Sequence, residues 1–321
     1  LNNVSGFDIS GNIDIQNPYE SHIFYNVNAS QNKDIGLYLH AVNRVNLTNI
    51  YTDDNLAYGL EIVSSAPILV LNSYFLINVS SNRNGGEGVR LSDVNDAFMN
   101  NLLMKNNANE GLSMIRSSNN TLADGNVSSL SLASSSANNT LLNISYITES
   151  VGVDSSLTRK WYYEAYANDT TGINISNANI TAYNASNAYQ FNLTTDATGY
   201  TPMTEIIDYT NNGGNIIYYS PYTIYASNSS YPTINHQLNV TNLTNIYKDV
   251  FTFGGENDTT VPNIDYGIGT ENDGSSYDRN WIYVNVTVNE TNEEKITFNL
   301  YNKSVSNTGL VLWLAMDEDK S

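Results

Sequence analysis

Few residues of this sequence are of a type that performs acid–base, nucleophilic or metal chemistry. The 321 residues include no cysteine and only 3 histidines. Thiol nucleophiles, disulfides and cysteine-ligated zinc are therefore excluded. In the first 150 residues, Asp53 and Asp54 are the only adjacent acidic pair, and Asp93 and Asp96 lie near one turn. Paired carboxylates can act as general acid and base, but the Thr-Asp-Asp-Asn sequence around the first pair is more typical of a solvated turn.

The other candidate groups do not form a catalytic pattern. No arrangement of two aspartates with an arginine recurs among the basic residues of this segment, which are Lys33, Arg44, Arg83, Arg90, Lys105 and Arg116. The sequence has no Walker loop, no dinucleotide-binding glycine fingerprint and no Gly-x-Ser-x-Gly motif. We therefore predict no catalytic residue, no metal site and no cofactor. The alternative is Ca²⁺ held by oxygen ligands in later acidic turns, which lack an EF-hand pattern: Asp265, Glu271, Asn272, Asp273 and Asp278.

The charge balance excludes two classes of partner. The 13 basic residues face 32 acidic ones, which gives a net charge of -19 and a pI of about 4.2. Nucleic acids and anionic membranes both require a basic surface, so neither is predicted as a partner. No stretch approaches the ~18–20 apolar residues of a membrane span. The chain begins at Leu1 without a signal-like segment, which indicates a processed protein or part of a longer chain.

Asparagine supplies a recurring motif with a chemical meaning. About one residue in six is asparagine, and about 20 Asn-X-Ser/Thr sequons occur, roughly twice the chance expectation. N-glycosylation of a secreted surface explains the excess. The alternative is that a polar β-protein rich in asparagine and threonine generates sequons freely. The predicted glycosylation sites are Asn3, Asn28, Asn46, Asn78, Asn119, Asn126, Asn138, Asn168, Asn174, Asn179, Asn184, Asn192, Asn228, Asn239, Asn242, Asn257, Asn285, Asn289 and Asn302.

A repeat of about 23 residues runs through the first half of the chain. The pattern Gly-apolar-X-apolar recurs at Gly36, Gly59, Gly88 and Gly111, at intervals of 23, 29 and 23 residues. Its alternation is typical of a strand with one buried face. We interpret the longer unit as the same unit with a polar insertion at residues 81–86. Such a period predicts the coils of a parallel β-helix, stacked on one continuous core.

An asparagine or aspartate also recurs 13 residues after each glycine. This position predicts a buried ladder of stacked side-chain amides that hydrogen-bond between coils. The predicted members are Asn26, Asn49, Asn72, Asn101, Asp124 and Asn143. Asn143 also begins a sequon, which we expect to be bare because of its place in the ladder.

With these glycine, apolar and asparagine positions, residues 1–150 resemble right-handed parallel β-helix proteins of the NosD and pectate-lyase-like superfamily. The resemblance implies a fold rather than an activity, because this fold hosts lyases, hydrolases, adhesins and scaffolds. The pectinase-type motifs are absent.

Residues 151–254 follow a different pattern. A polar turn at 168–172, a strand at 178–183 and the sequence TTDATGY at 194–200 resemble the carboxypeptidase-regulatory or transthyretin-like sandwich. That resemblance implies an all-β module without chemistry of its own. The aromatic-rich segment 218–225 could bind sugars by ring stacking, or could be ordinary core and edge packing. Residues 255–321 resemble part of an immunoglobulin-like sandwich, with strands at 281–288 and 295–301 and an apolar run, Leu310–Met316.

The predicted fold is therefore all-β, with a right-handed parallel β-helix at 1–150, a transthyretin-like sandwich at 151–254 and a partial Ig-like segment at 255–321. This order resembles modular cell-surface glycoproteins of archaea and some bacteria. The resemblance implies a non-enzymatic, N-glycosylated extracellular structural protein. A donor strand at Leu310–Met316 would complete a neighbouring copy and build head-to-tail filaments. The alternatives are a carbohydrate-binding adhesin and a β-helix polysaccharide lyase or hydrolase.

Overall fold

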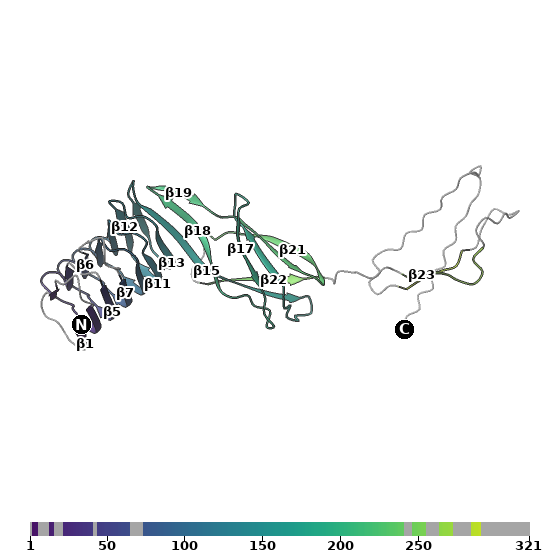
Figure 1. Ribbon diagram of the computed structural model, residues 1–321, viewed down its shortest axis with the longest axis horizontal. Coiled ribbons are helices and arrows are strands. Elements are labelled where there is room, and N and C mark those ends of the chain that lie inside the picture. The colour runs from purple at the N-terminus through teal and green to yellow at the C-terminus, as the bar shows by residue number, and fades with distance from the viewer. Residues whose placement is uncertain are drawn as a thin grey trace. The chain divides into compact units, whose positions relative to one another are not determined.

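The computed structural model describes residues 2–5, 13–15, 22–40, 44–64, 73–240, 246–254, 263–271 and 284–289. These residues form β-strands and no helix, which confirms the all-β prediction. They therefore also contain no helix that could cross a membrane. The chain divides into two units after Gly255, and the first unit contains both a β-helix and an antiparallel sheet (Figure 1).

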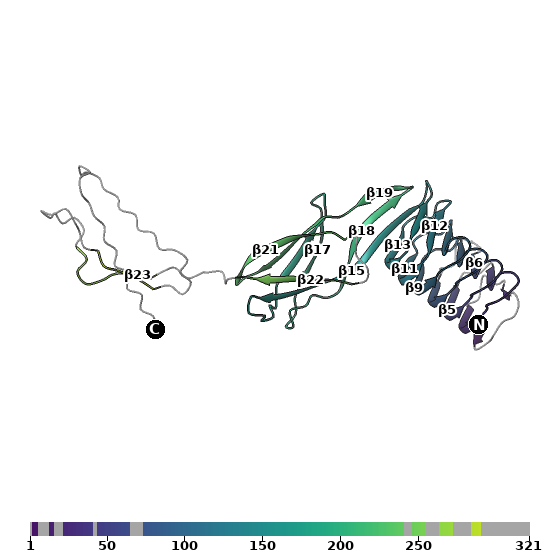
Figure 2. The ribbon, with the colours of Figure 1, turned by 180° about the vertical axis from the view of Figure 1, so that it is seen from behind.

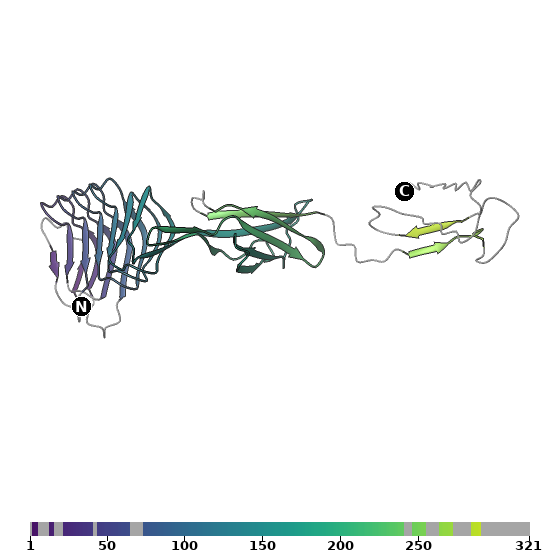
Figure 3. The same ribbon diagram turned by 90° about the horizontal axis from the view of Figure 1, so that it is seen from above.

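Each coil of the β-helix contributes one strand to each of two parallel sheets (Figure 3). The first sheet contains β1 (Asn2–Ser5), β3 (His22–Asn28), β5 (Arg44–Tyr51), β7 (Ser73–Ser80), β9 (Ala97–Met104), β11 (Thr121–Val127) and β13 (Asn139–Ser145). The second contains β2 (Ile13–Ile15), β4 (Leu37–His40), β6 (Leu60–Val63), β8 (Val89–Ser92), β10 (Leu112–Ile115), β12 (Ser129–Ala133) and β14 (Thr148–Val151).

The apolar positions of the glycine repeat face the interior, as predicted. In β4, β6, β8 and β10 the first and third residues are fully buried in one core cluster, which contains Leu37, Leu39, Leu60, Ile62, Val89, Leu91, Leu112 and Met114. Complete burial of each such side chain contributes about 1.5–3 kcal/mol. The stacked coils therefore share one core along their axis.

The longer coil gains its extra residues at a different place from the predicted insertion at 81–86. Three residues separate β4 from β5, whereas nine separate β6 from β7. The backbone amides of Thr52 and Asp54 donate to the carbonyls of Ser80 and Asn82, so the turn at 81–86 is in register with the turn before it. The predicted insertion is therefore wrong. Glycine spacing alone does not reveal on which side of a strand the extra residues enter.

One long strand belongs to both parts of the first unit. The first residues of β15 (Ser156–Asp169) pair parallel with β13, and its later residues pair parallel with β22 (Ile246–Phe253). Its opposite edge pairs antiparallel with β18 (Thr204–Asn212), which in turn pairs with β19 (Asn215–Tyr218). Figure 2 shows β15 between β13 and β18. A single sheet thus crosses the predicted boundary between residues 150 and 151.

A four-stranded antiparallel sheet lies against the far part of β15. Its order is β17 (Tyr189–Thr194), β16 (Asn179–Tyr183), β20 (Tyr222–Asn228) and β21 (Tyr231–Leu238). Buried residues of β15 and β22, such as Trp161 and Phe251, form one core cluster with Ile180 and Ile224 of this sheet. The two layers therefore form a small β-sandwich.

In the second unit, β23 (Asn263–Tyr266) pairs antiparallel with β24 (Val286–Asn289). The predicted strand at 281–288 overlaps β24, whereas 295–301 and Leu310–Met316 lie outside the described residues. Asn272, Asp273 and Asp278 of the predicted acidic turns also lie outside them.

Adjacent residues of β7 test the direction in which its side chains point. Leu76 is fully buried in the core, whereas Phe75 is 45% exposed. We expect Leu76→Ala to lower the free energy of unfolding by about 2–5 kcal/mol, because it leaves a cavity. Phe75→Ala should cost much less despite removing a larger side chain. Urea unfolding of protein produced without glycans measures both, and a reversed order would contradict the assigned faces.

Candidate functional sites

A column of asparagines runs along the first sheet, with one member in each coil from β3 to β13. Its members have left-handed backbone with φ between 52° and 57°, and they are Asn26, Asn49, Asn78, Asn101, Asp124 and Asn143. Asparagine and aspartate adopt this conformation more readily than most residues. Side-chain Nδ2 donates to Oδ1 of the preceding coil from Asn49 to Asn26 at 2.7 Å and from Asn78 to Asn49 at 2.8 Å. Asn101 donates to Asn78 in the same way at 2.8 Å.

Asp124 interrupts this outer column because a carboxylate has no hydrogen to donate toward Asn101. Its oxygens instead accept from Nδ2 of Asn143 at 2.7 Å, from Nδ2 of Asn100 at 3.1 Å and from the Tyr162 hydroxyl at 3.2 Å. The column thus changes from an amide chain to a carboxylate centre where the β-helix meets β15.

Two parts of the sequence prediction for the outer column are wrong. Asn78, rather than Asn72, is in register with Asn49, because the residues flanking each of them pair with one another. The cause is the misplaced insertion, and Asn72 itself lies outside the described residues. The side chains are also exposed or half-exposed, not buried. A left-handed residue interrupts the in–out alternation of its strand, so its side chain points to solvent.

A second, buried column of asparagines was missed by the sequence analysis. It occupies the turns before the second sheet and contains the buried Asn32, Asn55 and Asn84 and the half-buried Asn107. Oδ1 of Asn84 accepts from the backbone nitrogen of Asn55 at 2.9 Å and from its Nδ2 at 3.0 Å. Asn55 and Asn107 accept from the preceding coil in the same way. Every member lies four residues before a repeat glycine, which is the signal that could have revealed it.

The sequon asparagines whose side chains the structure describes are exposed or half-exposed, and none of them is buried. They differ in how Nδ2, the atom that carries an N-glycan, is used. Asn78 and Asn143 donate it within the outer column, and Asn228 donates it to the carbonyl of Ser176 at 3.1 Å. Asn46 instead uses Oδ1, which accepts a hydrogen bond from the hydroxyl of its own sequon residue Thr48 at 3.3 Å. The side chains of Asn3, Asn242, Asn257, Asn289 and Asn302 lie outside the described set.

The acidic residues considered for chemistry bind neighbouring coils instead of each other. Asp54 accepts two hydrogen bonds from the Arg83 guanidinium, each at 2.7 Å. Asp93 accepts two from Arg116, each at 2.8 Å. The hydrogen bond from Arg83 lowers the pKa of Asp54. Asp54 is thereby held ionised, which is unsuited to a general acid, and both carboxylates are occupied in cross-coil pairs.

A charged cluster on the outer face of the second sheet was also missed. Glu61 and Arg90 pair across neighbouring strands, with Arg90 Nε 3.6 Å from Glu61 Oε1. Arg90 Nη1 donates to the Tyr58 hydroxyl at 2.6 Å, and its guanidinium lies 5.1 Å from the centre of that ring. Burial raises the pKa of Glu61, nearby Arg90 lowers it, and the charge of Glu87 raises it further. Sequence spacing did not reveal the cluster because Tyr58 and Glu87 come from turns rather than from the strands.

Where the β-helix meets the sandwich, a polar network ties β14 to β18. Glu149 Oε2 accepts from the hydroxyls of Tyr146 and Tyr209, each at 2.6 Å, and Oε1 accepts from Asn211 Nδ2 at 2.7 Å. The Arg159 guanidinium lies 4.6 Å from the Tyr146 ring centre. All three hydrogen bonds that Glu149 accepts come from side chains of this protein, and two of the donors lie on β18. The network therefore acts as a joint between the β-helix and the sandwich.

Beside this joint lies a cavity of about 490 Å³ that includes a buried carboxylate and a sequon asparagine. Asp208 accepts from Trp161 Nε1 at 3.2 Å and lies 3.7 Å from Arg159 Nε. Burial raises the pKa of Asp208, and these two partners oppose that rise. Tyr218 and Asn239 also line the cavity.

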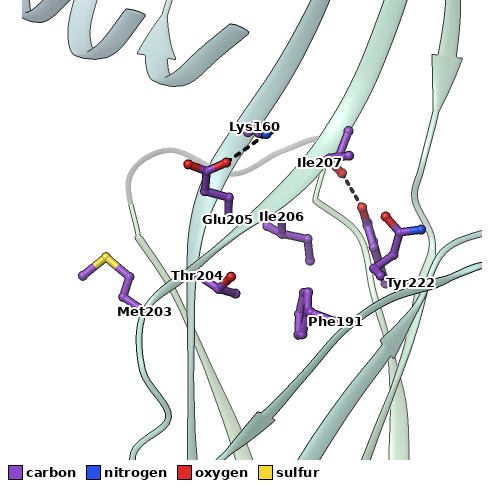
Figure 4. Close-up of a pocket in the computed structure, with 9 residues that line it drawn as sticks. Lys160, Phe191, Met203, Thr204, Glu205, Ile206, Ile207 and Tyr222 are labelled. Atoms are coloured by element: carbon purple, nitrogen blue, oxygen red, sulfur yellow. Dashed lines mark hydrogen bonds and ion pairs between the residues drawn. The ribbon is translucent and has the colours of Figure 1, made fainter. Parts of the chain in front are cut away.

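A second cavity, of about 460 Å³, lies against β15 and β18. Figure 4 shows its lining, with the Lys160–Glu205 ion pair at 2.9 Å on one side and apolar Phe191 and Ile206 on another. Lys160 and Glu205 neutralise each other, so this cavity offers no free acid–base pair. No group of three metal-ligating side chains occurs among the described residues.

The sandwich also contains a buried carboxylate that contacts a histidine. Asp249 on β22 accepts from the Tyr163 hydroxyl at 2.9 Å, and His236 Nε2 lies 2.9 Å from its other oxygen. Burial raises the pKa of Asp249, and the neighbouring His236 lowers it. His236 comes from β21, so the pair fastens the two layers of the sandwich together.

No protein-family model matches the chain, and a search of curated proteins finds no match. The structure therefore defines a class, a mostly β protein with long parallel sheets and an antiparallel sheet, without a family.

The two asparagine columns should differ in their effect on stability. Asn55→Ala removes an acceptor from the buried amides of Asn32, so we expect a loss of about 1–3 kcal/mol for each unpaired group. Asn49→Gly removes exposed amide bonds but suits a φ of 56°, so it should cost less than about 1 kcal/mol. Urea unfolding midpoints measure both, and equal losses would show that burial does not distinguish the columns.

Proposed function

We propose that this chain is a non-enzymatic, N-glycosylated structural protein of a microbial cell surface. The observation that carries the proposal is the sharing of β15 between the β-helix and the sandwich. Domains are usually joined by exposed linkers and move relative to one another. Here backbone hydrogen bonds join the two parts, and the Glu149 network adds side-chain bonds at the same place. This architecture suits a stiff spacer.

The use of the polar groups also supports a structural role. Asp54 and Asp93 are occupied in cross-coil pairs, and the buried asparagines satisfy one another. The described sequon asparagines are at least partly exposed, which glycan attachment requires. Acidity and glycans together favour an extracellular location.

The finer assignments are part of this proposal. One strand per coil in each parallel sheet supports the right-handed NosD and pectate-lyase-like resemblance, and the antiparallel sheet supports the transthyretin-like one. The link to archaeal-type surface glycoproteins depends on both. Head-to-tail assembly through Leu310–Met316 stays a prediction, because that run lies outside the described residues.

One observation favours the second candidate, a carbohydrate-binding adhesin or a polysaccharide lyase or hydrolase. The cluster of Glu61, Arg90 and Tyr58 places an acidic, a positively charged and an aromatic side chain on one outer face of the coils. Arginine and tyrosine are suited to binding acidic sugars, and a carboxyl with a raised pKa can act as a proton donor.

Incubation of the purified protein with acidic and neutral polysaccharides separates these candidates. We expect neither cleavage products nor retention on immobilised polysaccharide, because Arg90 is already paired with Glu61 and Tyr58. Cleavage that is lost in Glu61→Gln but kept in the control Glu205→Gln would establish the enzyme instead. Retention that is lost in Arg90→Gln but kept in the control Arg116→Gln would establish the adhesin.

Glycopeptide mapping of the native protein tests the main proposal. The native mass should exceed the 35.4 kDa of the polypeptide by several kDa, as expected for several glycans. Asn28 and Asn46 should carry glycans, whereas Asn78 and Asn143 should be bare because their Nδ2 atoms are used between coils. A native mass equal to that of the polypeptide would refute the proposal. Full occupancy of Asn78 would refute the role given to the outer column.

A further inference from the structure

The outward-pointing residues of the first sheet include exposed apolar side chains on both sides of the outer asparagine column. The large ones are Tyr25, Tyr51, Phe75, Phe98 and Leu103, which are 38% to 50% exposed. Phe75 and Phe98 are direct partners on β7 and β9, so their side chains are neighbours and form an apolar patch. Soluble proteins rarely leave a contiguous apolar patch uncovered unless something binds it.

Sequon asparagines stand in register with these same residues. Asn46 on β5 pairs with Phe75 on β7, and Asn28 on β3 pairs with Tyr51 on β5. Asn126 on β11 pairs with Leu103 on β9. Neighbouring strands lie about 4.7–4.9 Å apart, so residues in direct register on one face are side-chain neighbours. Each of these three glycan attachment points is thus beside an exposed apolar side chain.

We infer that the first sugars of the glycans on Asn28, Asn46 and Asn126 each pack on the exposed apolar side chain beside them, with the Asn46 sugar against the Phe75 ring of the patch. The inference rests on the proposed N-glycosylation. Attachment joins Nδ2 to the anomeric carbon of a phosphate-activated sugar, with loss of the phosphate leaving group and one amide proton. A pyranose ring has an apolar C–H face, which stacks on an aromatic ring, and a hydroxylated edge, which stays in water.

The position of Asn46 favours its own glycan over a second copy of the chain as the occupant. Asn46 lies between Ile23 and Phe75 in the same outward row, so its glycan emerges at the edge of the patch. A protein surface could not contact the patch closely with that glycan attached. The glycan covers apolar area while keeping the surface soluble, and this accounts for exposed rings that the coil core does not need.

Asn119 provides a matched control within the same coils. It is an exposed sequon asparagine with a φ of 59° in the turn between β10 and β11. Its backbone nitrogen donates to the carbonyl of Ala137 at 3.0 Å, which places Asn119 beside Asn138 of the next coil rather than beside an aromatic residue. A glycan there has no exposed aromatic ring of this patch beside it.

The test uses native glycosylated protein and an endoglycosidase acting on the folded chain. We expect the Asn46 glycan to be released several-fold more slowly than the Asn119 glycan of the same molecule. Phe75→Ala should remove this protection and leave the Asn119 rate unchanged. The comparison within the wild type keeps the inference falsifiable if that variant fails to fold. Equal release rates at both sites in the wild type would overturn it.

Binding of a fluorescent dye for apolar surfaces gives an independent measurement. Asn46→Gln should raise dye binding, whereas Asn119→Gln should not. Unchanged dye binding in a monomeric Asn46→Gln protein would contradict the packing. Dimers of that variant, seen by light scattering without increased dye binding, would assign the patch to a second copy and overturn the inference. Glycans elsewhere but none at Asn28, Asn46 or Asn126 would reject this inference alone, whereas no glycan at any site would reject the proposed function.

Discussion

The close stacking of a buried asparagine column against a glycine column is the constraint on which the β-helix depends. A Cβ atom on Gly36 would lie 2.5 Å from Asn55 Nδ2, and one on Gly59 would lie 2.6 Å from Asn84 Nδ2. A larger residue at either glycine would displace these side-chain amides from the column. The amides in turn accept the backbone N–H groups of the neighbouring turn, so glycine spacing and hydrogen-bond register support each other.

The two asparagine columns solve different problems with the same side chain. The buried column satisfies polar groups inside a turn, where an unpaired amide would be costly. The outer column supplies residues that tolerate a left-handed backbone at the bend in the strands of the first sheet from β3 to β13. Together they help explain why asparagine is so abundant in a chain with few charges.

The structural use of polar side chains also supports the function that we propose. Asp54 and Asp93 hold adjacent coils together, and Glu149 holds the joint between the β-helix and the sandwich. Groups that could perform chemistry are thereby used for stiffness. The sequon asparagines and exposed rings that remain on the surface suit the attachment and packing of glycans that we propose.

The sequence by itself determined the all-β class, the coil period and the buried faces of β4, β6, β8 and β10, because glycine spacing and period-2 alternation are local signals. It did not determine the position of the insertion. Asn72 was therefore predicted as the member of the outer column at the position that Asn78 occupies. It also predicted a buried column 13 residues after each glycine, whereas the buried column lies four residues before it. The sharing of β15, the Glu149 joint and the pairing of Asn46 with Phe75 were decided by the tertiary structure alone. These contacts join segments 18 to 84 residues apart through strand register, and register depends on how all the coils pack together.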